Sequence, residues 1–251
     1  MIEKITIKQS LYVRASFFTM DEIRRQARLS LNEIDENLVK DLTIQKEKLE
    51  NQQNTILKSL IISIFLSFMS YNGGNIEVPG FGIMISEIPA FLEISLISSS
   101  FAILVISYTF LNIQIYTAVI QQISSTVIAK KLLDADLFCA AQTPTWLFFK
   151  YCRFSPVIGR PPTYVISKYG NIFYTILISS ITLTLMLLWI FAIFSVVYLA
   201  QMGLSDSPAG WSVYIVCMFT IFAACMVMAA NVLEFNHEMD LETAEDISID
   251  T

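Results

Sequence analysis

The sequence predicts an all-α integral membrane protein with four transmembrane helices, a long cytoplasmic N-terminal helix and a small outer β-hairpin. Three observations predict this class. Of the 251 residues, 55% are hydrophobic and only 15% are charged, whereas soluble domains carry about 25% charged residues. Long stretches, among them residues 171–200 and 211–233, contain no charge at all. The basic residues also avoid two of the connecting loops. Uncharged stretches of this length are typical of helices that cross a bilayer.

Charge placement predicts the topology. The loops 72–90 and 200–210 contain no Lys or Arg, whereas ten of the 16 basic residues lie at or before Lys58 and six lie within 130–168. By the positive-inside rule, this bias places both termini and the 120–170 loop in the cytoplasm. The chain is therefore expected in the cytoplasmic (inner) membrane, with the lipid bilayer as its first partner. The four spans are predicted at about 56–71, 91–119, 171–199 and 211–233.

The first span is the shortest, and its assignment depends on the topology. Residues 56–71 make up 16 positions and include Lys58, which is short of the roughly 20 apolar residues that a bilayer normally requires. A three-span alternative, with 56–71 as an interfacial helix, would leave the ten basic residues outside. We therefore expect 56–71 to cross the membrane and Lys58 to extend its ammonium group to the inner interface.

The N-terminal segment, residues 1–55, predicts a short strand followed by a long amphipathic helix. Residues 4–9 alternate in part between apolar and polar, and Thr19 or Asp21 is suited to cap a helix. From there to residue 57 the chain has no Gly or Pro, and apolar residues recur every three or four positions. This seam is expected to pack as a coiled coil between copies, or else against the chain's own 120–170 loop. The seam residues are Leu31, Ile34, Leu38, Leu42 and Leu49.

Two connecting segments carry further predictions. In the outer loop, two runs of β-prone residues flank "PGFG" at 79–82, which predicts a small hairpin. In the cytoplasmic loop, residues 143–154 combine aromatic and basic side chains. This composition favours a helix in the headgroup plane, the alternative being an aromatic contact beneath the N-terminal helix. The predicted membrane-interface residues are Lys58, Trp146, Phe148, Phe149, Tyr151 and Arg153.

The C-terminal segment, residues 234–251, is acidic. It contains seven Asp and Glu residues and no Lys or Arg. Such a tail is typical of a disordered segment, and the alternative is an acidic strip that docks a soluble cytoplasmic protein partner. The predicted docking residues are Glu238, Asp240, Glu242, Glu245 and Asp246.

The central parts of the spans lack the residues that membrane catalysis uses. Intramembrane enzymes and ion-coupled transporters place Asp, Glu, His or Lys at depth, and the long apolar runs contain none of these. The single His and the four Cys form no zinc or haem pattern. We therefore expect no enzyme activity, no cofactor, no metal site and no direct contact with nucleic acid.

Small and hydroxyl-bearing residues are frequent in the spans instead. They predict close packing of helices within the chain or between copies, and a Ser/Thr-lined pore is the alternative. In the second span these residues are Ser95, Ser98, Ser99, Ser100 and Ala102.

The function that these features predict is that of an oligomeric inner-membrane scaffold or sensor that docks a cytoplasmic protein. A homo-oligomer is expected, with four copies as the predicted number. The architecture is analogous to small multi-span membrane subunits that pair with a cytoplasmic effector in some bacterial defence systems, an analogy that does not establish function. The alternative is a homo-oligomeric ion channel or pore.

Overall fold

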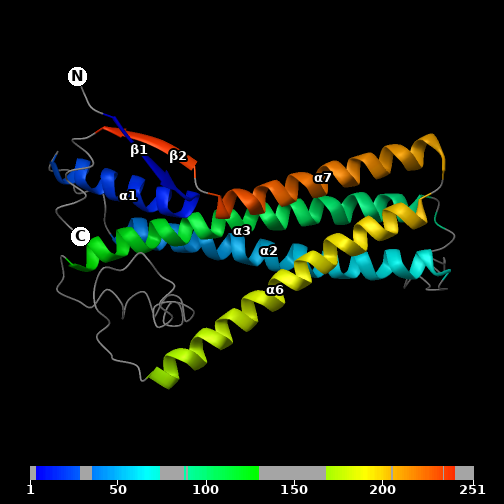
Figure 1. Cartoon of the computed structure of the whole chain (residues 1–251), viewed down its shortest axis with the longest axis horizontal. Coiled ribbons are helices and arrows are strands. Elements are labelled where there is room, and N and C mark those ends of the chain that lie inside the picture. Colours follow the sequence, from blue (N-terminus) through cyan, green and yellow to red (C-terminus); the bar gives the residue numbers. More distant parts are fainter. Residues whose placement is uncertain are drawn as a thin grey trace. The chain divides into compact units, whose positions relative to one another are not determined.

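The computed structural model describes residues 4–28, 36–73, 88, 90–129, 168–204, 206–233 and 235–240 (Figure 1). Within these residues, helices carry the fold, which confirms the predicted helical character, and a single pair of strands accompanies them. The helices are α1 (Leu11–Arg28), α2 (Glu36–Tyr71), α3 (Phe91–Ala129), α6 (Lys168–Gly203) and α7 (Pro208–Val232). The strands are β1 (Lys4–Gln9) and β2 (Phe235–Asp240).

Four of these helices, α2, α3, α6 and α7, are long and apolar enough to cross a membrane. They occur in the order of the four predicted spans, so the prediction of four membrane-competent helices is confirmed by length and composition. The candidate spans are Asn37–Tyr71, Phe91–Ser124, Ser179–Gly203 and Pro208–Ala230, and each contains an apolar window of 18 residues.

Local sequence signals explain where several helices begin and end. The Ser10 hydroxyl accepts a hydrogen bond from the Val13 N–H (3.5 Å) at the start of α1, and Ser207 accepts one from the Gly210 N–H (3.1 Å) at the start of α7. Pro208 occupies the first turn of α7, where the missing N–H costs nothing. At the end of α2, Gly73 has a φ of 68°, a left-handed conformation that glycine adopts without strain.

The N-terminal region differs from its prediction in two ways. The helix begins at Leu11 rather than near Thr19 or Asp21, so the predicted cap is wrong; the Thr19 hydroxyl donates instead to the Ala15 carbonyl (2.8 Å) inside α1. The expected single helix is described as two, α1 ending at Arg28 and α2 beginning at Glu36, with 29–35 outside the described residues. The predicted strand over 4–9 is confirmed.

The chain divides into two compact units. The four-helix unit comprises Ile44–Gln114 and Met186–Asn231. The terminal unit comprises Met1–Thr43, Ile115–Leu185 and Val232–Thr251. Helices α2, α3 and α6 each continue without a break from one unit into the other.

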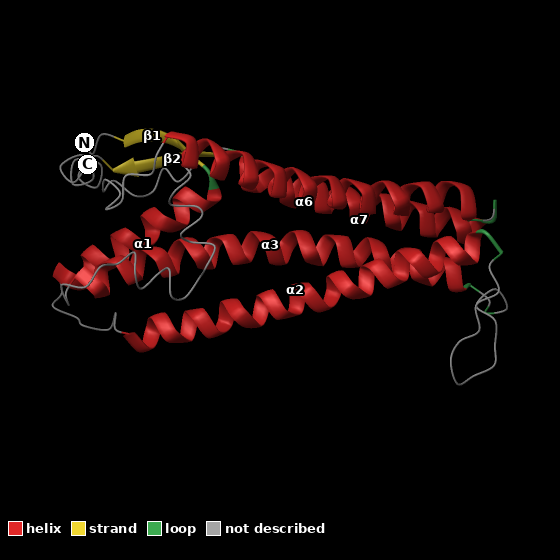
Figure 2. Cartoon of the chain, turned by 90° about the horizontal axis from the view of Figure 1, so that it is seen from below, coloured by secondary structure: helices red, strands yellow, loops and turns green. Residues whose placement is uncertain are grey.

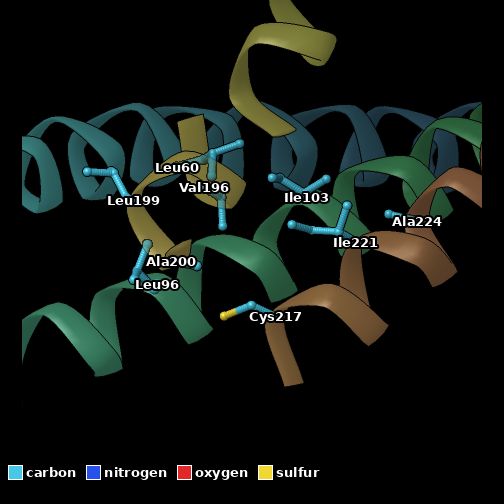
Figure 3. Packing of buried hydrophobic residues seen from close by; sticks show 9 residues of the cluster. All are labelled: Leu60, Leu96, Ile103, Val196, Leu199, Ala200, Cys217, Ile221 and Ala224. Carbon is cyan, nitrogen blue, oxygen red and sulfur yellow. The ribbon is translucent and has the colours of Figure 1, made fainter. Parts of the chain in front are cut away.

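Helix α3 is the most buried helix of the four-helix unit. Of its apolar window 39% is buried, against 11% for α2, 17% for α6 and 22% for α7. Figure 3 shows buried side chains of all four helices converging there: Leu60, Leu96, Ile103, Val196, Leu199, Ala200, Cys217, Ile221 and Ala224. At one end of this unit, Gly203 allows α6 to approach closely, because a Cβ there would lie 2.8 Å from Leu92 Cδ2 and 3.2 Å from Tyr71 Cδ2.

The terminal unit is built from segments that are distant in the sequence. Val39 of α2 and Ile123 of α3 form a buried apolar cluster, and Ile23 of α1 packs against it. Strands β1 and β2 pair antiparallel, with Lys4 opposite Asp240 and Gln9 opposite Phe235 (Figure 2). Residues 235–240 are therefore a strand, which corrects the prediction of disorder for this part of the tail.

The topology prediction gives an expected result in intact cells. A single Cys at Asn75 or Ser205, in a variant without the native cysteines, is expected to react with a membrane-impermeant maleimide. The physical reason is that loops 72–90 and 200–210, which lack basic residues, should be the translocated ones. Labelling of Thr251→Cys under the same conditions would contradict this orientation.

Candidate functional site

A cluster of hydroxyl groups joins α2 to α3 inside the four-helix unit. Ser95 Oγ lies 2.9 Å from Ser63 Oγ and 2.7 Å from Ser67 Oγ. The Ser99 hydroxyl donates to Ser63 Oγ at 2.9 Å. Each helix contributes two serines four positions apart, and residues at this spacing lie on one face of a helix. The cluster is thus formed by two matching faces, and we call it the serine cluster.

Burial of the serine cluster decides between the two interpretations of the small polar residues. Ser67 is 0% exposed and Ser99 is 1% exposed, so these hydroxyls pack against the neighbouring helix. Small residues let helix backbones approach, and hydroxyls then hydrogen-bond between the helices. This arrangement favours helix packing over a Ser/Thr-lined pore for these positions. Ser98, on the same helix, is exposed.

Further polar contacts continue along α3 away from the serine cluster. The Trp189 Nε1–H of α6 donates to Ser107 Oγ at 3.3 Å, and the Gln53 amide of α2 donates to the Ile106 carbonyl at 3.5 Å. These two bonds place Gln53 and Trp189 at nearly the same level of α3. Side chains that follow Gln53 on α2 and Trp189 on α6 therefore lie at similar levels of the four-helix unit.

The opposite face of α2 carries a row of exposed polar residues. Lys48, Asn51, Thr55 and Lys58 follow one another at spacings of three or four positions, and all four are exposed. The row continues with two exposed apolar side chains, Ile62 (59% exposed) and Phe65 (56%). Spacings of three and four keep these residues on one side of the helix. We call the six residues the α2 stripe.

The α2 stripe has no side-chain partner within the described part of the chain. The described contacts of its polar members are internal to the helix: the Thr55 hydroxyl donates to the Asn51 carbonyl (2.9 Å), and the Thr55 carbonyl accepts from the Ser59 hydroxyl (3.1 Å). The nearby ion pair of Lys46 with Glu50 (Nζ–Oε1, 3.3 Å) involves Lys46, which is 9% exposed. The charged end of Lys58 is therefore not neutralised by that pair.

Helix α1 of the terminal unit carries charged side chains of both signs. On α1, the Arg25 guanidinium makes two contacts with the Glu22 carboxylate (2.8 and 2.9 Å), and these hydrogen bonds hold the pKa of Glu22 below its usual range. Arg14 lies over the ring of exposed Phe18, 5.2 Å from the centroid. In the sheet, the register places the acidic Glu238 and Asp240 opposite residues of β1.

The predicted seam residues have different surroundings. Leu38 and Leu42 pack on the cluster of Val39 and Ile123 within the chain, the arrangement expected when the helix folds onto its own chain. Leu49 is half-buried in the four-helix unit, whereas Leu31 and Ile34 lie outside the described residues.

Some of the other predicted residues lie within the described part of the chain and others lie outside it. Lys58 is exposed on α2, and Glu238 and Asp240 belong to β2. The residues outside the described part of the chain are Trp146, Phe148, Phe149, Tyr151, Arg153, Glu242, Glu245 and Asp246, together with the outer hairpin. Among the described residues, no group of three or more His, Cys, Asp or Glu could hold a metal ion.

Sequence reasoning missed the α2 half of the serine cluster and the α2 stripe. The signal for the cluster was present, because Ser63 and Ser67 repeat the four-residue spacing of Ser95 and Ser99. The signal for the stripe was the change from polar to apolar along one face of the helix, which a search for a single apolar seam overlooks.

Comparison of the chain with protein-family models, with curated proteins and with solved structures found no match.

Proposed function

We propose that the chain is the membrane subunit of a homo-oligomer in the inner membrane, that both termini are cytoplasmic, and that it acts as a scaffold or sensor. In this proposal the terminal unit docks a soluble cytoplasmic protein. The analogy with membrane subunits of bacterial defence systems gives one setting for such a pair, without establishing it.

The observation that carries the proposal is the composition of the terminal unit. It combines both chain ends, paired as β1 and β2, with α1 and the adjoining parts of α2 and α3. Crossing a bilayer does not require such a unit. A surface assembled from three distant segments of the chain is well suited to recognise a partner, because its shape depends on all of them at once.

Helix length also supports a docking role. Helices α2, α3 and α6 contain 36, 39 and 36 residues, which corresponds to about 54, 58 and 54 Å. The hydrocarbon core of a bilayer is only about 30 Å thick. Roughly 25 Å of each helix is therefore in excess of the length that a perpendicular crossing needs.

Charge indicates what the partner's surface carries. The tail concentrates seven acids and no Lys or Arg in 234–251, which favours encounter with a basic surface. Exposed charges are screened by salt, so the proposed complex should weaken as ionic strength rises.

An ion channel is the second candidate function, and the α2 stripe is the observation that favours it. Exposed Lys, Asn and Thr side chains on a membrane-competent helix are what a polar pathway between copies would use.

Affinity purification tests the docking role. Deletion of residues 236–251 is expected to reduce recovery of a stoichiometric soluble partner at least tenfold, because it removes the acids beyond β2 and all of β2 except Phe235. The oligomer should persist, since the four-helix unit retains all its residues. Deletion of 247–251 is the matched control, because it keeps Glu238 to Asp246. Equal recovery from both deletions would contradict the role of residues 236–246 in docking. No stoichiometric partner for the full chain, together with ion conduction in bilayers, would replace the scaffold by the channel.

A further inference from the structure

We propose that copies of the chain place the α2 stripe around a shared water-filled vestibule, which opens at the Lys48 end of the stripe and draws in small anions through Lys58. The inference rests on the homo-oligomer of the proposed function and assigns the lining and the ion class of the channel alternative. Its occupants are second copies of this chain and water.

The first step concerns the environment of the stripe. Lys48, Asn51, Thr55 and Lys58 are exposed, and no residue of the described chain covers them. A lysine near the end of a span can extend its ammonium group to the interface, whereas amide and hydroxyl groups deeper in a membrane helix face water or protein. Face-to-face contact between stripes without water would bring lysines together. Water between the copies is the arrangement that solvates them.

The second step is depth. Tyr71, Leu92 and Gly203 meet at one end of the four-helix unit, and this meeting marks the end of three helices. Lys58 lies thirteen positions before Tyr71, or about 20 Å along the helix. A hydrocarbon core of about 30 Å measured from the same end includes that position. Thr55, three positions further, falls about 24 Å from the same end.

The neighbouring helices confirm that this depth is apolar elsewhere. Trp189 of α6 lies at the level of Gln53, and the next turn of α6 toward Gly203 exposes Ile190 (43%), Phe191 (65%) and Phe194 (65%). Fourteen positions after Pro208, α7 exposes Phe222 (62%). Among the described helices of this unit, only α2 exposes a lysine at such a depth. That contrast separates a lipid-facing side of the unit from a side that faces water.

The third step is the geometry of the stripe. From Lys48 to Phe65 the spacing is three, four, three, four and three, the repeat with which helices face one common axis in a bundle. The polar members come first and the apolar Ile62 and Phe65 follow. Around an axis, this order gives a wet chamber that narrows to an apolar constriction, where dewetting can stop ions.

The ion class follows from the charges along α2. Between Asn51 and Tyr71, Lys58 is the only residue that is charged at neutral pH. At the mouth, Lys48 is next to Glu47, and Lys46 is paired with Glu50 on the packed side. A ring of Lys58 ammonium groups is therefore the dominant charge inside the chamber, and rings of basic side chains select anions.

Cysteine accessibility in the full chain tests the vestibule. In proteoliposomes of a variant whose four native cysteines are alanine, Thr55→Cys is expected to react with hydrophilic thiosulfonates, and Phe191→Cys is expected to be protected by lipid. The anionic sulfonate reagent should react with Thr55→Cys about tenfold faster than the cationic reagent. Lys58→Gln should abolish that preference, and Lys40→Gln, an exposed lysine elsewhere on α2, should preserve it.

The outcomes separate this inference from the proposed function on which it rests. If native mass spectrometry shows an oligomer while Thr55→Cys is as protected as Phe191→Cys, the vestibule is overturned and the homo-oligomer stands. If the protein is monomeric, both fail, whether or not Thr55→Cys reacts. Reactivity without an anion preference overturns the role of Lys58 alone. Equal reactivity of Ile62→Cys and Thr55→Cys overturns the apolar constriction.

Discussion

Replacement of Ser95 with Leu is expected to separate α2 from α3 and to lower the stability of the four-helix unit by about 2–4 kcal/mol. Ser95 is 8% exposed and its hydroxyl lies within 3 Å of two serine hydroxyls on α2. A larger side chain at a close-packed site costs about 1–3 kcal/mol, and each lost interhelical hydrogen bond adds about 0.6–2 kcal/mol. The midpoint of thermal or denaturant unfolding in detergent measures the loss.

Ser98→Leu is the matched control for this prediction. It makes the same chemical change three positions away on the same helix, where the side chain is exposed. Its effect is expected to stay within about 0.5 kcal/mol. Equal destabilisation by the two substitutions would mean that the serine cluster does not hold α2 against α3.

The second large effect is expected from Val39→Asp in the terminal unit. Val39 is 2% exposed at the centre of the cluster that joins α1, α2 and α3. A carboxylate without a partner in an apolar cluster is strongly disfavoured, at a cost of about 3 kcal/mol or more. Hydrogen exchange should rise in α1 and in 115–124, while the four-helix unit keeps its protection, because its buried cluster is a separate one.

Lys40→Asp provides the comparison, since it introduces the same carboxylate at the next position, which is exposed. It should leave exchange in α1 unchanged. On the proposed function, Val39→Asp should also lose the soluble partner and Lys40→Asp should retain it. Loss of exchange protection throughout the chain would instead show that the two units unfold together.

Local composition was sufficient to predict part of the fold. Long uncharged stretches predicted four membrane-competent helices, because burying backbone amides in an apolar environment requires internal hydrogen bonds over the whole stretch. The partial alternation of residues 4–9 likewise predicted β1. The start of α1 was misplaced, because Ser10 and Thr19 are equally suitable caps by residue type and only the fold selects between them.

Only the tertiary structure determined which segments of the chain pack against one another. The acidic tail alone indicates disorder, and its first part becomes a strand because β1 supplies the matching hydrogen bonds. Ser95 and Ser98 are both serines of the second span. Ser95 is buried in the serine cluster and Ser98 is exposed, since the helix turns the two positions to different sides. The amides and Lys58 of α2 were visible in the sequence. Their common exposed face, at a depth where α6 and α7 are apolar, depends on which side of α2 packs against α3.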